Sequence, residues 1–180
     1  MEPSIQHVRY TTTAFPPYRF IPGKFPHPVA NPDGHSYLPP GASEPAVPYF
    51  PPEMWRESEA YLFGCDLYNH GYWWEAHEAW EGMWHVVPKP SAQRSFLQGL
   101  IQVTAGHMQV QLGKVEGVRR LQLTSRRHLD VALDVAGNGA FMGLRLAAWR
   151  SAVDAYWDVV LAAERIEHRV ASYPYILLGD

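Results

Sequence analysis

The most informative part of this chain is the stretch Glu75-Ala-His-Glu-Ala-Trp-Glu-Gly-Met-Trp-His85. It contains no proline, and its polar residues recur at helical spacing. At about 3.6 residues per turn, His77, Glu81 and His85 lie on one line along a helix, with Glu78 beside that line. Tryptophans border this polar stripe. The stretch therefore predicts a half-buried helix that carries a polar site.

Helical patterns continue on both sides of this stretch. Gly71 and Gly113 follow two apolar patterns, as glycine does where helices end, and Pro88 ends the pattern that contains the polar stripe. Short connections favour antiparallel neighbours. The sequence thus predicts an all-α fold, an up-and-down bundle of about five helices, with an extended segment from Ser172 to Leu178. The expected helices cover residues 52–70, 72–86, 91–112, 115–135 and 146–167.

The first 52 residues differ in composition from the rest of the chain. They hold thirteen of the sixteen prolines, which restrict the backbone to extended forms and donate no hydrogen bonds. They also hold many aromatic side chains, in which disordered segments are usually poor. We predict an extended arm over residues 1–52 that packs its aromatic side chains on a helical domain of residues 53–180.

Charge and cysteine content narrow the classes of function. The net charge is −3 and the basic residues are scattered, which argues against a nucleic-acid partner. A single cysteine, Cys65, excludes an internal disulfide and favours a reducing compartment. The sequence shows neither a signal peptide nor an apolar run long enough for a membrane span. We expect a cytoplasmic protein with a small-molecule or protein partner and no membrane partner. The aromatic arm could equally wrap a second subunit of a homo-oligomer.

Two motifs make the chain resemble a known family. Gly71-Tyr-Trp-Trp-Glu-Ala-His-Glu-Ala-Trp-Glu-Gly-Met-Trp84 is followed by Arg94-Ser-Phe-Leu-Gln-Gly-Leu-Ile-Gln102. Over about residues 56–135 this pattern is similar to the domain-of-unknown-function 309 family. The resemblance implies a helical bundle and the family's label of predicted metal-dependent hydrolase. It extends to the arm motifs Pro26-His-Pro28 and Gly34-His-Ser36, whereas the indoles of Trp73 and Trp80 depart from the family pattern and would narrow a pocket.

A metal site is the first interpretation of the polar stripe. His77 and Glu81 are spaced i, i+4, a spacing at which two side chains of one helix can chelate one cation. We expect these two residues as ligands, His107 as a third ligand from another helix, and Glu78 as the general base for a bound water. This interpretation predicts one divalent ion, zinc, manganese or iron, and a metal-dependent hydrolase.

The second interpretation is a structural polar network. Four arginines, Arg119, Arg120, Arg126 and Arg127, share one face of the predicted fourth helix. They could pair with the carboxylates of the polar stripe, since buried carboxylates need donors. The protein would then be a non-catalytic helical module that binds a ligand or a protein and has no cofactor. Arg127 and its neighbours could also bind a phosphate group, unless Glu116 and the stripe neutralise them.

Five further residues are candidates for binding. Gln98 and Gln102 are spaced i, i+4 and could orient a ligand or simply join two helices by amide hydrogen bonds. His128 lies on the apolar side of the predicted fourth helix, where a histidine is either a core residue or a ligand. His27 and His35 lie in turns of the arm, which could either pack there or bring a ligand to the site.

Overall fold

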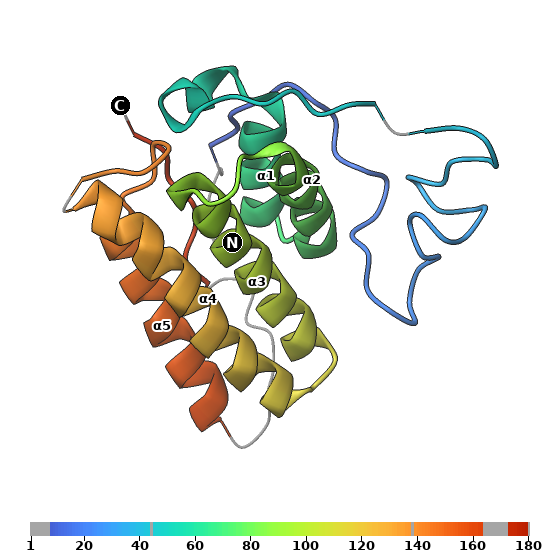
Figure 1. The fold of residues 1–180 in the computed structure, drawn as a ribbon. Helices are drawn as coiled ribbons and strands as arrows, with labels where there is room; N and C mark the ends of the chain where they lie inside the picture. The colour runs from blue at the N-terminus through green and yellow to red at the C-terminus, as the bar shows by residue number, and fades with distance from the viewer. Residues whose placement is uncertain (1–7, 44, 138, 164–172, 180) are drawn as a thin grey trace.

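The fold is all-helical, as the sequence predicts (Figure 1). The computed structural model describes residues 8–43, 45–137, 139–163 and 173–179. Within these residues there is no β-strand, only isolated bridges from Leu144 to Phe141 and to Leu178. The end of the predicted fifth helix and Ser172 lie outside the described residues. The elements are η1 (Pro52–Glu57), α1 (Glu59–Asn69), α2 (Trp73–Val86), α3 (Ala92–Gln111), α4 (Val115–Ala136) and α5 (Leu146–Ala162).

Local sequence signals explain where the helices begin and end. Gly71 and Gly113 have φ angles of +77° and +66°, a conformation that glycine adopts without the steric cost of a side chain. Ser91 caps α3 by accepting the backbone N–H of Arg94. The single helix predicted for residues 52–70 is wrong in one respect. Ser58 is extended and its side chain caps α1, so that a separate 3-10 helix, η1, precedes it.

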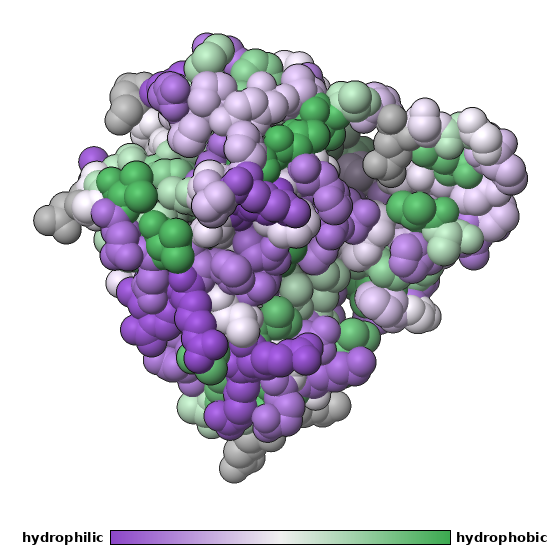
Figure 2. Space-filling view, in the orientation of Figure 1, coloured by the Kyte–Doolittle hydropathy of each residue, from purple (hydrophilic) through white to green (hydrophobic). Residues whose placement is uncertain are grey.

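Helices that follow one another in the sequence pack against one another. The contacts join α1 to α2, α2 to α3, α3 to α4 and α4 to α5, the neighbours expected of an up-and-down bundle (Figure 1). The side chains of α3 are buried on most of its sides, in agreement with its nearly continuous apolar sequence. On the face seen in the space-filling view, hydrophilic side chains predominate over the lower part of the bundle and hydrophobic ones appear in small patches (Figure 2). The core therefore lies around α3.

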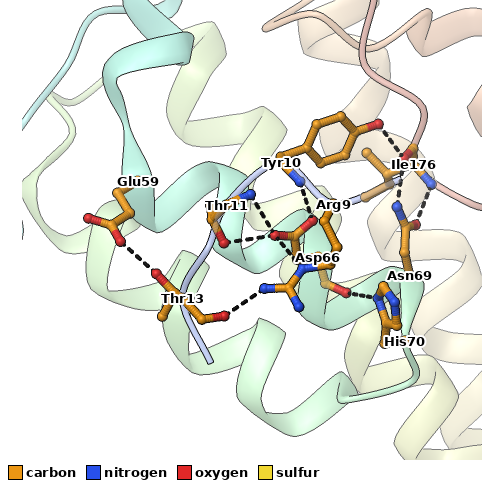
Figure 3. Close-up of polar contacts among 9 residues, drawn as sticks. All are labelled: Arg9, Tyr10, Thr11, Thr13, Glu59, Asp66, Asn69, His70 and Ile176. Carbon is orange, nitrogen blue, oxygen red and sulfur yellow. Dashed lines mark hydrogen bonds and ion pairs between the residues drawn. The ribbon is translucent and has the colours of Figure 1, made fainter. Parts of the chain in front are cut away.

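Asp66 of α1 fastens the beginning of the arm to the bundle (Figure 3). Its buried carboxylate accepts the backbone N–H groups of Tyr10, at 2.7 Å, and Thr11, at 2.9 Å. The hydroxyl of Thr11 donates to the same carboxylate, and the guanidinium of Arg9 lies 3.1 Å from it. One side chain thus satisfies donors from three consecutive arm residues.

The last described segment is fastened to α1 beside this anchor (Figure 3). The side-chain amide of Asn69 donates to the carbonyl of Ile176 and accepts its N–H, both at 2.8 Å. The hydroxyl of Tyr10 donates to the same carbonyl and accepts the N–H of Leu178. The end of α1 therefore joins two segments from opposite ends of the sequence.

The arm buries only part of its aromatic side chains. Phe20 is buried, and Tyr10 and Phe15 pack against the core. In contrast, Phe25 and Tyr49 remain exposed. Some aromatic side chains of residues 8–43 thus contact the bundle, and the division into an arm of residues 1–52 and a helical domain of residues 53–180 stays a prediction. None of the described helices combines the length and apolarity that crossing a bilayer requires.

Candidate functional site

A group of three potential metal ligands lies on α2. Donor atoms of His77, Glu78 and Glu81 lie within 4.8 Å of one another, and all three residues are half-buried. The Nε2 atom of His77 is 3.9 Å from Oε2 of Glu81. With bonds of about 2.1 Å, two donors on one ion are at most about 4.2 Å apart. These side chains can therefore reach one ion with small rotations.

A buried hydroxyl on α3 orients the imidazole of His77. Thr104 donates its only hydroxyl proton to the carbonyl of Ile101, at 2.6 Å. Its oxygen, 3.5 Å from Nδ1 of His77, can therefore only accept a proton from that nitrogen. The neutral imidazole thus carries its proton on Nδ1, and the lone pair of Nε2 faces the carboxylate of Glu81.

The electrostatics keep this imidazole neutral. Burial lowers the pKa of His77 below its ordinary value of 6.5, and this effect outweighs Glu81 and the carbonyl of Ile101, which both raise the pKa. A neutral nitrogen lone pair and a carboxylate oxygen then face each other without a proton between them. That arrangement favours a cation placed between the two groups.

The structure does not bring His107 into the group on α2. His107 is fully buried, and its ring stacks on Trp73 with centroids 4.8 Å apart and an angle of 13° between the planes. Its Nε2 lies 3.3 Å from the hydroxyl of Tyr68, and the rings of Tyr156, Trp157 and Tyr173 are among its other neighbours. These contacts are those of a core histidine in an aromatic cage. Its predicted role as a third ligand stays a prediction.

Gln98 and His128 converge on a cavity where the end of α2 meets the start of α3, beside α4. They line a cavity of about 200 Å³ together with Trp84 of α2 and Arg94 of α3. Burial lowers the pKa of His128. The side-chain oxygen of Gln102, one turn beyond Gln98, is buried and has no hydrogen-bond partner among the described residues. The pair of glutamines therefore does not act as a single unit.

The histidines of the arm lie against the start of α2, in contact with Trp74. Nδ1 of His27 accepts the N–H groups of Val29 and Ala30, each at 3.3 Å, which is turn chemistry. Nε2 of His35 lies 3.1 Å from the buried carboxylate of Glu75. Neither histidine belongs to the group of His77.

Two of the arginines on α4 have acidic partners away from α2. Arg119 pairs with Glu116 of its own helix, at 3.7 Å, and Arg126 pairs with Asp154 of α5, at 3.7 Å. Arg127, the arginine next to His128, is exposed. For Arg119 and Arg126, the predicted pairing with the carboxylates of the polar stripe is thus replaced by contacts on the outer face of α4 and α5.

Sequence reasoning missed four residues that organise this region. Asp66 and Glu75 hold the arm, Thr104 orients His77, and Arg94 lines the cavity. A signal existed for Asp66, because a charged residue at a core position of an amphipathic helix needs a dedicated partner. For Thr104, in a nearly continuous apolar helix, no such signal separates it from an ordinary core threonine.

A family comparison agrees with the motifs. Residues 61–121 match the model of a family described as "Domain of unknown function (DUF309)". The chain resembles the DUF309 family. The matched range contains the whole group on α2 and also Gln98, Gln102 and His107, whereas His27, His35, Arg127 and His128 lie outside it. No curated protein and no solved structure matches the chain.

Proposed function

We propose that this protein binds one divalent metal ion through His77 and Glu81, with Glu78 beside the ion as general base, and acts as a metal-dependent hydrolase. The observation that carries the proposal is the orientation of His77, whose Nε2 lone pair faces the carboxylate of Glu81. One nitrogen and carboxylate oxygens suit zinc, manganese or iron(II). All three residues keep some solvent exposure, which leaves room for a water molecule and a substrate.

Each residue of the proposed metal site would have a separate role. His77 and Glu81 would hold the ion, and Thr104 would keep the imidazole in the required tautomer. A bound divalent ion supplies Lewis acidity, which lowers the pKa of a coordinated water. Glu78 would accept a proton at its carboxylate and pass it to the leaving group. The arginines of α4 support the structural-network alternative less well, since Arg119 and Arg126 pair elsewhere.

The first test measures metal binding by protein prepared without a histidine tag. We expect close to one equivalent of zinc, manganese or iron, and a higher melting temperature with the metal than in chelator. His77→Ala should weaken metal binding at least about tenfold, since even residues that only orient a ligand change affinity about 10–100-fold. His85→Ala is the matched control, an exposed histidine of the same helix. Protein that stays metal-free and melts identically in chelator would contradict the proposal.

The second test removes the hydroxyl that orients His77. Thr104→Val keeps the shape of this buried side chain and removes one acceptor for Nδ1–H, leaving the carbonyl of Ile101 as the other. We expect at most about tenfold weaker metal binding, because the imidazole is then oriented only by the carbonyl of Ile101 and is held less firmly with Nε2 toward Glu81. Circular dichroism and calorimetric titration with zinc separate this effect from unfolding. Unchanged zinc affinity in a folded variant would mean that Thr104 does not position the ligand.

The third test addresses hydrolysis. Metal-loaded protein is assayed against chromogenic esters of phosphate and carboxylate, with chelated protein as the blank. Glu78→Gln should lower the rate about a hundredfold, a typical contribution of a general base, while metal content is retained. Absence of chelator-sensitive turnover on both ester classes would refute the hydrolase part of the proposal and leave the metal site standing.

A further inference from the structure

A second polar site lies where the end of α2 meets the start of α3. It is a cavity of about 200 Å³, and its polar lining comes from three helices and the loop before α3. None of the residues that line it is acidic. The lining residues with polar groups or a large ring are Trp84, Ser91, Arg94, Ser95, Gln98 and His128.

Arg94 makes this cavity unusual because its positive charge is buried and, among the residues that the structure describes, no carboxylate pairs with it. The residue is 8% exposed. Its guanidinium donates to the backbone carbonyls of Trp84 and Val87 and lies 3.5 Å from the centre of the Trp84 ring. These partners are neutral. A buried charge is usually paired with an opposite one, so carbonyls and a π-face compensate it only in part.

The partial charges at the neighbouring helix ends do not cancel the positive charge of the site. The carbonyls at the end of α2 carry partial negative charge, but the first turn of α3 carries a partial positive charge of similar size. That first turn contains no acidic residue and instead contains Arg94 itself. The ammonium group of Lys89 lies 5.7 Å from the centre of the Trp84 ring and adds a further positive charge nearby. The described surroundings of the guanidinium therefore contain no negative side chain to neutralise it.

The remaining polar lining can complete the coordination of an anion. The amide of Gln98 and the hydroxyl of Ser95 offer donors, and His128 offers one N–H in its neutral form. We propose that this cavity binds an anionic group, a phosphate or a carboxylate, with Arg94 supplying the charge and Gln98 and His128 the directional hydrogen bonds. Trp84, which lines this cavity, lies one turn after Glu81 on α2. The anion site itself does not depend on the metal proposal.

Calorimetric titration with inorganic phosphate and with acetate tests this inference, in chelator so that no metal contributes. We expect saturable binding of at least one of the two anions, and their ratio identifies the preferred class. Gln98→Leu and His128→Leu should each weaken that binding about tenfold, the loss expected for one hydrogen bond to a charged ligand. These two variants leave the carbonyl contacts of Arg94 in place.

Two controls separate a built site from general attraction of anions. Arg126→Gln removes an exposed positive charge of α4, and Gln109→Leu removes an amide near the other end of α3. Both should bind the anion as the wild type does. His77→Ala should also retain anion binding, which distinguishes this site from the proposed metal site. The inference is overturned if neither anion binds saturably, or if Gln98→Leu and His128→Leu leave binding unchanged.

Discussion

Replacing Asp66 with alanine is expected to lower the free energy of unfolding by about 3–5 kcal/mol. The carboxylate accepts the backbone N–H groups of Tyr10 and Thr11 and the hydroxyl of Thr11 (Figure 3). Hydrogen bonds to a charged acceptor contribute about 1.5–3 kcal/mol each, and their loss leaves part-buried donors without partners. Arg9 adds less, because its side chain is 32% exposed and can return to water.

Denaturant unfolding measures this loss, and amide hydrogen exchange locates it. Exchange should accelerate first at Tyr10 and Thr11, since the arm loses its anchor before the bundle loses its core. Asp130→Ala is the matched control, because Asp130 is a helical aspartate with 50% side-chain exposure that pairs with Arg150. It should cost less than about 1 kcal/mol. An Asp66→Ala protein within 1 kcal/mol of wild type, with slow exchange at Tyr10, would show that other contacts hold the arm.

The helical part of the fold was predictable because its signals are local. The ends of α2 and α3 follow from residues next to them, such as Pro88 and Ser91. The separation of η1 from α1 was missed, because a serine inside a helical pattern and a serine that caps a helix look alike in sequence. Ser58 takes the second role by adopting an extended backbone.

The sequence predicts correctly only those residues of the candidate site that lie on one helix. His77, Glu78 and Glu81 come together because helical geometry fixes neighbours at i, i+1 and i+4. The position of His107 depends on how α3 is rotated against α2, which no local spacing encodes, and it lies in an aromatic cage. The same limit explains why Arg94, which lies on the next helix, was not recognised as a site residue.

The contacts of the arm with the bundle are the least predictable part of the structure from local sequence patterns. Its prolines exclude helices, and its aromatic side chains favour contact with the bundle. Single buried carboxylates determine where each part of the arm binds. Asp66 contacts residues 9–11, and Glu75 contacts Phe20 and His35. An extended segment has no periodicity from which such pairings could be read.

Trp80→Ala is the second substitution with a large expected effect, a loss of about 3–5 kcal/mol. The indole is fully buried, and its N–H donates to the carbonyl of Tyr61 on α1. It fits against Gly64, where the Cβ of any larger residue would overlap the ring. The indole expected to narrow a pocket therefore fills a notch in the neighbouring helix, and this contact sets how α2 is rotated about its axis.

A double-mutant cycle of Trp80→Ala with Gly64→Ala tests this account. The effect of Gly64→Ala on the free energy of unfolding should change sign between the two backgrounds. In the wild type, the added methyl group overlaps the indole and should cost about 1–3 kcal/mol. In the Trp80→Ala background the same methyl group enters the cavity and replaces a helical glycine, a change that is worth about 0.5–1 kcal/mol by itself. Gly64→Ala should therefore raise the free energy of unfolding of the Trp80→Ala protein. Gly82→Ala, whose methyl group would meet Val47 instead of Trp80, should have the same effect in both backgrounds.

The rotation of α2 links this cycle to the candidate site. His77 follows Trp73 and precedes Trp80 on the same helix, so the buried indoles determine that its imidazole reaches Thr104. Trp80→Ala, if it folds, should therefore weaken zinc binding as well as stability, and Gly64→Ala should restore part of both losses in that background. Recovery of stability without recovery of zinc affinity would show that the notch holds α1 and α2 together but does not orient the metal ligands.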